Sequence, residues 1–247
     1  MTSPGEAALR HPRRWVLSMD WDDLLFAHWP VDPRVLRPLL PRTDPPLELD
    51  LRDGVAWIGV VPFRMSRVHP RWLPPIPGTH TFPELNVRTY VRVGGLPGVW
   101  FFSLDATSRL AVRAARLTYH LPYFDADIQV GTDPRTGTTR YRSHRTHRGG
   151  GEARLDVTYA PTGSPKRSDP GTLESWLTER YRLFAADRRG RVWRGEIHHE
   201  PWPLQPAAAE FHTLDMTGWL GLELPKHPPH LLHARHLSVQ AEALVRC

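Results

Sequence analysis

The chain has 247 residues, of which 40% are hydrophobic and 10% are aromatic. A chain of this size can bury a substantial core, as one large all-β domain or as two small ones, and we expect one. The formal net charge of +6 comes from 32 Lys+Arg against 26 Asp+Glu, and only Lys166 and Lys226 are lysines. Because the arginines are spread along the chain without a compact basic block, the charge does not favour nucleic-acid binding.

Cysteine content and hydropathy narrow the class of protein further. The single cysteine, Cys247, excludes an internal disulfide and a cysteine-based metal cage. Residues 1–14 contain no apolar leader segment, and nowhere do 18 apolar residues follow one another. We therefore predict a soluble cytoplasmic protein, with a disordered tail at residues 1–14 and a single domain at residues 15–247.

The first half of the chain is predicted to be mostly strand. The whole sequence contains 26 prolines and 18 glycines, which separate short runs rich in β-branched and aromatic residues. A short helix is expected after Asp32, which can cap it, with Pro33 at its first position. Gly94-Gly95 predicts the turn of an antiparallel hairpin, and the proline-rich residues 71–78 predict a loop. The expected strands lie near residues 15–21, 55–61, 84–93 and 99–104.

The second half is predicted to contain two helices among further strands. Thr107 or Ser108 caps a helix that runs to Leu117, and Thr172 caps a second one over residues 173–184. The strands are expected near residues 123–130, 138–146, 153–159, 191–198 and 231–244. The densest basic cluster alternates along one of these strands and predicts its exposed face; its members are Arg140, Arg142, His144, Arg145, His147 and Arg148.

Four segments carry a family resemblance. They are WDDLLFAHWPVDP from residue 21, FPELNVRTYV from 82, WFFSLDA from 100 and HHEPWPLQP from 198. With them the chain resembles the YqjF-like bacterial family of unknown function over most of residues 15 to 237, and residues 81–128 resemble the central segment of acetoacetate decarboxylases. The resemblance implies a mainly β (α+β) fold, an acetoacetate decarboxylase-like antiparallel barrel or cone with a few flanking helices. It also implies an enclosed small-molecule site and association into a homo-oligomer.

The catalytic lysine of acetoacetate decarboxylases has no counterpart at the matching motif. In that family the segment ends in Gly-x-Pro-Lys-Lys, where one lysine forms a Schiff base, whereas this chain reads His120-Leu121-Pro122-Tyr123-Phe124. The hydroxyl of Tyr123 can donate a hydrogen bond to a developing oxyanion but cannot form an imine. We therefore expect no lysine adduct and no cofactor. The alternative for Tyr123 is an ordinary core aromatic.

Glu84, Asn86 and Arg88 alternate along a predicted strand, so their side chains share one face. In an apolar barrel, burial would raise the pKa of Glu84 and the charge of Arg88 would lower it. The resemblance implies that Glu84 matches the family glutamate that assists proton movement. The alternative is a buried Glu84–Arg88 pair that only holds the sheet in register.

Histidines and aromatic residues supply the other candidates. His227, His230, His233 and His236 recur every third residue, and on a strand such neighbours point to opposite faces, so we expect no metal site. Asp105, before a predicted helix, is expected to be a cap or turn residue. Further candidates for the pocket, each with core packing as the alternative, are Arg64, His28, Trp29, Trp57, His199 and His233.

These observations lead to one functional hypothesis and two alternatives. The pocket binds a small keto acid, enol or related carboxylate, held by Arg88 or Arg64, while Glu84 moves a proton and Tyr123 stabilises oxygen charge. The first alternative is a non-catalytic ligand-binding or sensory protein that uses the same pocket. The second is an assembly protein that exposes the apolar loop at residues 72–76.

Overall fold

The computed structural model describes residues 14–73, 80–108, 112–113, 116 and 118–247. Of the tail predicted at residues 1–14, only Arg14 is described, and most of the helix predicted to end at Leu117 also lies outside the described residues. In the predicted loop at residues 71–78, Trp72 and Leu73 are exposed, Arg71 is half-buried, and residues 74–78 lie outside the described part.

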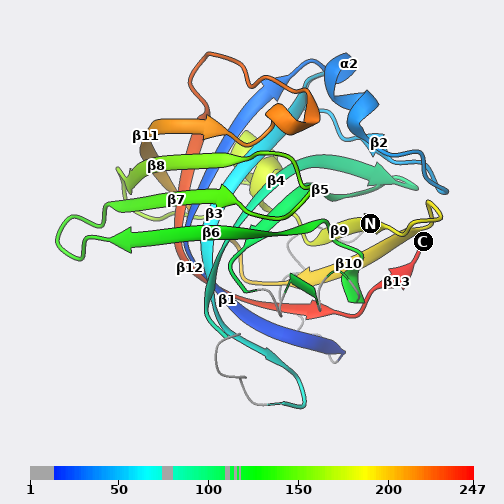
Figure 1. Cartoon of the computed structure of the whole chain (residues 1–247), viewed down its shortest axis with the longest axis horizontal. Helices are drawn as coiled ribbons and strands as arrows, with labels where there is room; N and C mark the ends of the chain where they lie inside the picture. The colour runs from blue at the N-terminus through cyan, green and yellow to red at the C-terminus, as the bar shows by residue number, and fades with distance from the viewer. Residues whose placement is uncertain (1–13, 74–79, 109–111, 114–115, 117) are drawn as a thin grey trace.

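Five long antiparallel strands form a curved wall at the centre of the molecule (Figure 1). Their order is given by the pairing of each strand with the next. They are β12 (His230–Glu242), β1 (Trp15–Val31), β3 (Ala56–Pro70), β4 (Phe82–Val93) and β5 (Leu96–Ala106). β4 and β5 form the hairpin predicted at Gly94-Gly95, with Val93 opposite Leu96.

Four strands close this wall into a barrel on one side. β5 pairs in parallel with β6 through Leu104–Ala106, and β11 pairs with β12 at its start, Gln205 opposite His233. The closed ring therefore contains nine strands: β1, β3, β4, β5, β6, β7, β8, β11 and β12. The four closing strands are β6 (Tyr123–Thr132), β7 (Thr139–Arg145), β8 (Arg154–Pro161) and β11 (Gln205–Asp215).

Two strands close the same wall on its other side (Figure 1). β9 (Arg182–Ala186) pairs in parallel with β5 at Val99 and Trp100, and β10 (Val192–His198) pairs with β12 at Ile197 and His198. β5 and β12 therefore each change partner along their length. The result is a second, smaller ring that shares the five-strand wall with the barrel.

Because the wall separates two interiors, its strands are buried on both faces. On β3, Val60 packs into the barrel core, whereas the next residue, Val61, packs into the second ring. On β4, Leu85 and Val87 face the barrel core and Glu84 faces the second ring. A strand that is buried on both faces needs apolar residues at consecutive positions, which explains the continuous apolar sequence of residues 55–61.

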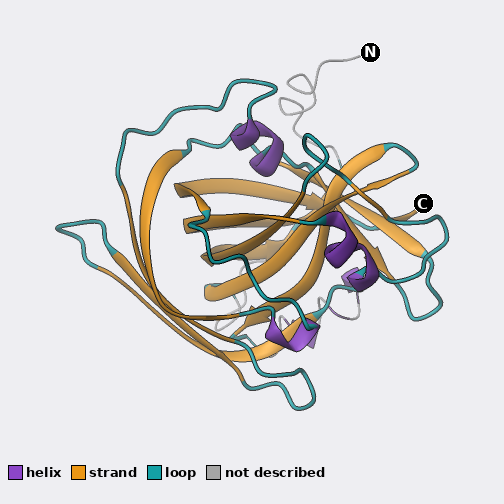
Figure 2. Cartoon of the chain, turned by 90° about the horizontal axis from the view of Figure 1, so that it is seen from above, coloured by secondary structure: helices purple, strands orange, loops and turns teal. Residues whose placement is uncertain are grey.

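The remaining elements are short and lie at the periphery (Figure 2). Helix α2 (Pro33–Leu36) has the predicted cap, since the Asp32 side chain accepts a hydrogen bond from the backbone N–H of Arg34 at 2.8 Å. Helix α4 (Leu173–Thr178) is capped by Thr172 as predicted. No helix among the described residues is long and apolar enough to cross a membrane. The other elements are η1 (Arg37–Leu39), η2 (Gly218–Leu220), β2 (Glu48–Leu49) and β13 (Val245–Arg246).

The mainly β fold is confirmed, and two predicted elements need correction. The helix predicted over residues 173–184 ends at Thr178, and Leu183 and Phe184 instead belong to β9, where pairing with β5 and burial of Phe184 outweigh the helical spacing. β11 (Gln205–Asp215) was not predicted, because Pro206 and three consecutive alanines give it low strand propensity.

Asp105 and Arg145 form a buried ion pair inside the barrel. Arg145 donates from Nε to Oδ1 at 2.6 Å and from Nη2 to Oδ2 at 2.8 Å, and its guanidinium lies over the ring of Phe124 at 4.2 Å. Asp105 is therefore a strand residue of β5 and the predicted cap or turn role is wrong. The exposed face predicted for the basic cluster holds for Arg140 and Arg142 but not for Arg145, which alternates to the inner face.

Candidate ligand-binding cavity

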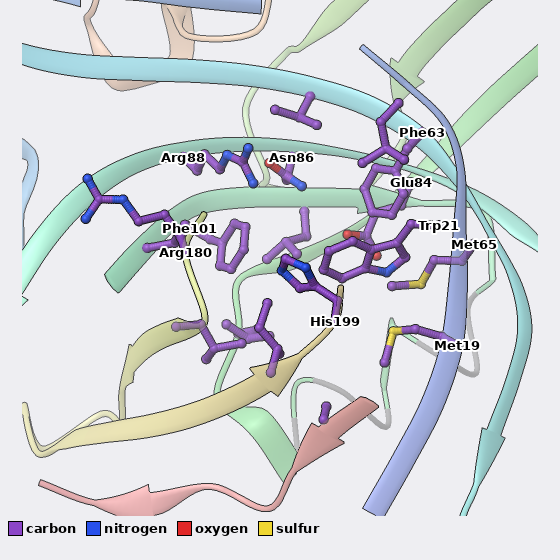
Figure 3. A pocket seen from close by; sticks show the side chains of 18 of the residues that line it. Met19, Trp21, Phe63, Met65, Glu84, Asn86, Arg88, Phe101, Arg180 and His199 are labelled. Carbon is purple, nitrogen blue, oxygen red and sulfur yellow. The ribbon is translucent and has the colours of Figure 1, made fainter. Parts of the chain in front are cut away.

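The second ring encloses a cavity of about 120 Å³ (Figure 3). Most of its wall is apolar, and the aromatic and methionine side chains come from β1, β3, β5 and the segment after β10. These side chains are Met19, Trp21, Phe63, Met65, Phe101 and Trp202. The barrel interior, in contrast, is filled by packed side chains such as Trp29, Tyr141 and Tyr159. An apolar cavity with a few polar groups is the usual form of a small-molecule site.

Glu84 and Tyr123 form a hydrogen-bonded pair in this cavity. Glu84 faces inward from β4, and Tyr123 starts β6, where it lies opposite Leu104 of β5. The Tyr123 hydroxyl donates to Oε2 of Glu84 at 2.9 Å. Burial raises the pKa of Glu84 to about 8, the hydrogen bond from Tyr123 opposes this, and the charge of Asp105 adds to it. The carboxyl is therefore mostly protonated at neutral pH.

Arg88 lies on the same face of β4 but does not pair with Glu84. Four residues along a strand separate the two by roughly 13 Å at their Cα atoms, and no carboxylate of the described residues lies within 4.0 Å of the Arg88 guanidinium. That group lies over the ring of Phe26 at 5.3 Å, and its Nε is buried with no partner in the described part of the chain. Asn86, between them, also faces the cavity. The register-holding Glu84–Arg88 pair is therefore not formed.

A second arginine, Arg180, reaches the cavity from the turn after α4. Its Nη1 donates to Asp50 at 2.7 Å and its Nε to the Trp176 carbonyl at 2.6 Å. Its Nη2 is buried, and no described residue pairs with it. Asp50 also accepts from Arg92 at 2.7 Å, so one carboxylate serves two arginines. Sequence reasoning placed Arg180 within a helix. Its partner Asp50 lies between β2 and β3, 130 positions away in the chain, so the local sequence around Arg180 could not predict this ion pair.

His199 follows β10 and lines the cavity (Figure 3). Its Nδ1 lies 2.7 Å from the carbonyl oxygen of Glu200, and its Nε2 is buried without a partner among the described residues. Burial lowers the pKa of this imidazole to about 4, against the raising effect of the Glu200 carbonyl, so the ring is neutral. The ring of Tyr181 stacks on it with 4.6 Å between centroids.

Comparison with known proteins identifies the family. A family model described as "Uncharacterized conserved protein", DUF2071, matches residues 18–238. The chain belongs to the DUF2071 family. The "Uncharacterized protein YqjF" of Bacillus subtilis (strain 168) is 44% identical over 225 residues, which cover 91% of this chain and 90% of that protein. The YqjF-like resemblance predicted from the four segments is thereby confirmed.

Solved structures share the fold of this DUF2071 chain. An acetoacetate decarboxylase-like enzyme from Sphingomonas wittichii RW1 superposes with a TM-score of 0.64 at 14% identity, covering 94% of this chain and 93% of that one. An acetoacetate decarboxylase from Legionella pneumophila gives 0.63 at 13% identity, covering 98% and 94%. The enduracididine biosynthesis enzyme MppR, complexed with pyruvate, gives 0.61 at 14% identity, covering 99% and 94%. The predicted acetoacetate decarboxylase-like fold is confirmed.

Neither lysine of the DUF2071 chain lines the cavity. Lys166 exchanges backbone hydrogen bonds with Leu204 at 2.8 and 2.9 Å, outside the second ring, and Lys226 is exposed after η2. Tyr123, at the start of β6, lies in the segment that matches the lysine motif of acetoacetate decarboxylases. Its hydroxyl proton is donated to Glu84. The Tyr123 hydroxyl therefore holds the Glu84 carboxyl by a hydrogen bond, and the oxyanion role of Tyr123 stays a prediction.

Five of the predicted pocket residues do not line the cavity. Arg64 pairs with Asp23 at 3.0 Å, and His233 lies 3.3 Å from Gln205. His28 is fully buried, with Nε2 2.7 Å from the Tyr90 hydroxyl, and its ring occupies the space above Gly59, where a Cβ would come within 2.8 Å. Trp29 and Trp57 belong to core packing, the alternative considered for both.

The histidines of β12 are held by separate partners. His236 pairs with Asp22 at 2.7 Å and His230 lies 3.6 Å from Glu174, while upstream His198 pairs with Glu242 at 3.0 Å. Within the described ranges, no group of three or more His, Cys, Asp or Glu side chains is arranged to hold a metal ion. The spacing of three along a strand accounts for this separation, because alternate residues face opposite sides.

Proposed function

We propose that this protein binds a small carboxylate in the cavity of the second ring and that Glu84 transfers a proton to or from it, without a lysine imine. The observation that carries the proposal is the buried carboxyl of Glu84, which faces the same apolar space as Arg88, an arginine without a carboxylate partner among the described residues. Carboxyl groups with raised pKa values in a cavity cluster at functional sites.

Arg88 and Arg180 make one part of the cavity electropositive. Arg88 has no acidic partner in the described structure, and Arg180 and Arg92 share the single carboxylate of Asp50. Arg88 is half-buried, and a bound carboxylate would pair with its charge in the apolar surroundings of the cavity. Cavities of about 150 Å³ hold a benzene-sized molecule, so this one suits a ligand of roughly six non-hydrogen atoms.

Glu84 would serve as the proton-transfer group. In its ionised form it would take a proton from the carbon beside a ketone; the C–H bond breaks, a C=C bond forms and the ketone oxygen takes the charge. The protonated carboxyl would return a proton in the reverse direction. The hydrogen bond from Tyr123 fixes the carboxyl orientation in both states. Because ionisation rises through about pH 8, the rate of proton removal should rise over the same range.

Replacing Arg88 with alanine should weaken binding of pyruvate and similar small carboxylates by at least about 30-fold, since a desolvated charge contact contributes about 2 to 5 kcal/mol. Titration calorimetry would measure this. Arg64→Ala is the matched control, because Arg64 pairs with Asp23 outside the cavity. Equal losses in both variants would refute the assignment of Arg88 as the carboxylate-binding residue.

Glu84→Gln should retain carboxylate binding but lose proton transfer, because glutamine preserves the shape and an acceptor for Tyr123 but cannot exchange a proton. The measurement is exchange of the methyl protons of pyruvate for deuterium in D₂O, followed by NMR, with acetoacetate as a second probe. The wild type should accelerate exchange and the variant should not. Binding without exchange by the wild type would favour the ligand-binding or sensory alternative over an enzyme.

A further inference from the structure

Residues that line the cavity hold five of the thirteen buried polar side-chain atoms that lack a hydrogen-bond partner in the described part of the chain. Buried polar groups are nearly always paired, so such a concentration indicates what a ligand must supply. Three of the atoms are donors and match an anion or a carbonyl oxygen. The other two are acceptors. The donors are Trp21 Nε1, Arg88 Nε and Arg180 Nη2, and the acceptors are Asn86 Oδ1 and His199 Nε2.

The acceptor state of His199 follows from its contact with the backbone. A carbonyl oxygen can only accept, so the Nδ1 atom 2.7 Å from the Glu200 oxygen must carry the proton and donate it. A neutral imidazole has one N–H, and burial keeps this ring neutral by lowering its pKa to about 4. Nε2 therefore presents a bare lone pair.

The direction of that lone pair is fixed by packing. The His199 ring lies between aromatic neighbours, with centroids 4.6 Å from Tyr181 and 5.2 Å from Trp202. Turning the ring would break the bond to Glu200 and these contacts together. Figure 3 shows the imidazole directed into the same space as Glu84 and Asn86.

We infer that the ligand of this cavity carries a hydroxyl or enol group that donates a hydrogen bond to Nε2 of His199, so that the cavity selects hydroxy or enol acids over the matching keto acids. The inference rests on the proposed function, because the same ligand places its carboxylate at Arg88. A ketone oxygen only accepts, and it would leave the His199 lone pair unpaired on binding. A hydroxyl that donates to Nε2 would remove the cost of this unpaired buried acceptor, whereas a ketone would leave that cost in place.

Three pairs of small acids that differ only in this group test the inference by titration calorimetry: pyruvate and lactate, 2-oxobutyrate and 2-hydroxybutyrate, and acetoacetate and 3-hydroxybutyrate. In each pair that binds, the hydroxy acid should bind the wild type at least about tenfold more tightly. His199→Asn retains a side-chain N–H for the Glu200 carbonyl but lacks the Nε2 atom. In this variant the hydroxy acid should lose its advantage while the keto acid keeps its affinity.

His198→Asn is the matched control, because the neighbouring imidazole pairs with Glu242 and does not line the cavity; it should keep the wild-type preference. Equal or tighter binding of the keto acids, or an unchanged preference in His199→Asn, would overturn the inference. If His199→Asn does not fold, the wild-type comparison within each pair still decides. If the acids bind with the help of Arg88 but the hydroxy acids have no advantage, this inference alone is rejected. If none of the acids binds, the proposed function is rejected as well.

Discussion

Glu84→Gln is expected to raise the stability of the protein at pH 8 and to leave it nearly unchanged at pH 4. The folded-state pKa of Glu84 is raised from 4.5 to about 8 by burial. Below pH 4.5 the carboxyl is protonated in both the folded and the unfolded state, so its ionisation does not change the free energy of unfolding. As the pH rises, the unfolded chain loses this proton first, and the wild type loses stability until the folded carboxyl also ionises near pH 8.

The expected loss is somewhat more than about 1 kcal/mol for each pH unit in that window, or on the order of 4 to 5 kcal/mol in total. Urea denaturation of wild type and Glu84→Gln at several pH values between 4 and 9 would measure the difference. Glu210→Gln is the control, because its side chain is 78% exposed, and it should follow the wild type. A constant difference between wild type and Glu84→Gln across this range would show that Glu84 is not held protonated.

Asp105→Ala is expected to destabilise the fold by about 3 to 5 kcal/mol. The substitution removes both hydrogen bonds that Arg145 makes to a carboxylate and leaves its guanidinium buried, with only the Gly150 carbonyl at 2.8 Å as a remaining acceptor. The side chains of this pair are 0% and 1% exposed, so water cannot compensate. Urea denaturation at pH 7 gives the free energy of unfolding.

A second ion pair of the same sheet provides the comparison. Arg140 and Asp156 lie 3.0 Å apart on the outer face of β7 and β8, with side chains 53% and 23% exposed. Because solvent screens such a pair, Asp156→Ala should cost at most about 1 kcal/mol. Similar losses in the two variants would mean that burial of the Asp105–Arg145 pair does not decide its contribution.

The alternation of residues predicted correctly which side chains of the central strand β4 share a face, although it misplaced Arg145 on β7. Alternation along residues 84–93 places Glu84, Asn86 and Arg88 on one side of β4, and all three line the cavity. The caps at Asp32 and Thr172 and the hairpin at Gly94-Gly95 were likewise predictable. Each of these features depends on neighbours within a few positions, where backbone geometry is fixed by local sequence.

The length and type of some elements depended on pairing with distant strands. The helical spacing predicted from Leu173 continues to Phe184, yet residues 182–186 form β9 because β5 offers a free edge at Val99 and Trp100. β11 forms despite Pro206 and three alanines, because β8 pairs with it along most of its length. Such pairing stabilises a strand whose own propensity is low.

The sequence by itself determined the mainly β fold, the family and the face of β4 that Glu84, Asn86 and Arg88 share. Only the tertiary structure decided that this face belongs to the second ring and not to the filled barrel. It also decided that Tyr123, 39 positions from Glu84, holds the carboxyl, that Arg180 and His199 reach the same cavity, and that Arg64 and His28 do not. These outcomes rest on contacts between segments far apart in the chain. Local periodicity sets the face of a side chain but not the interior that it meets.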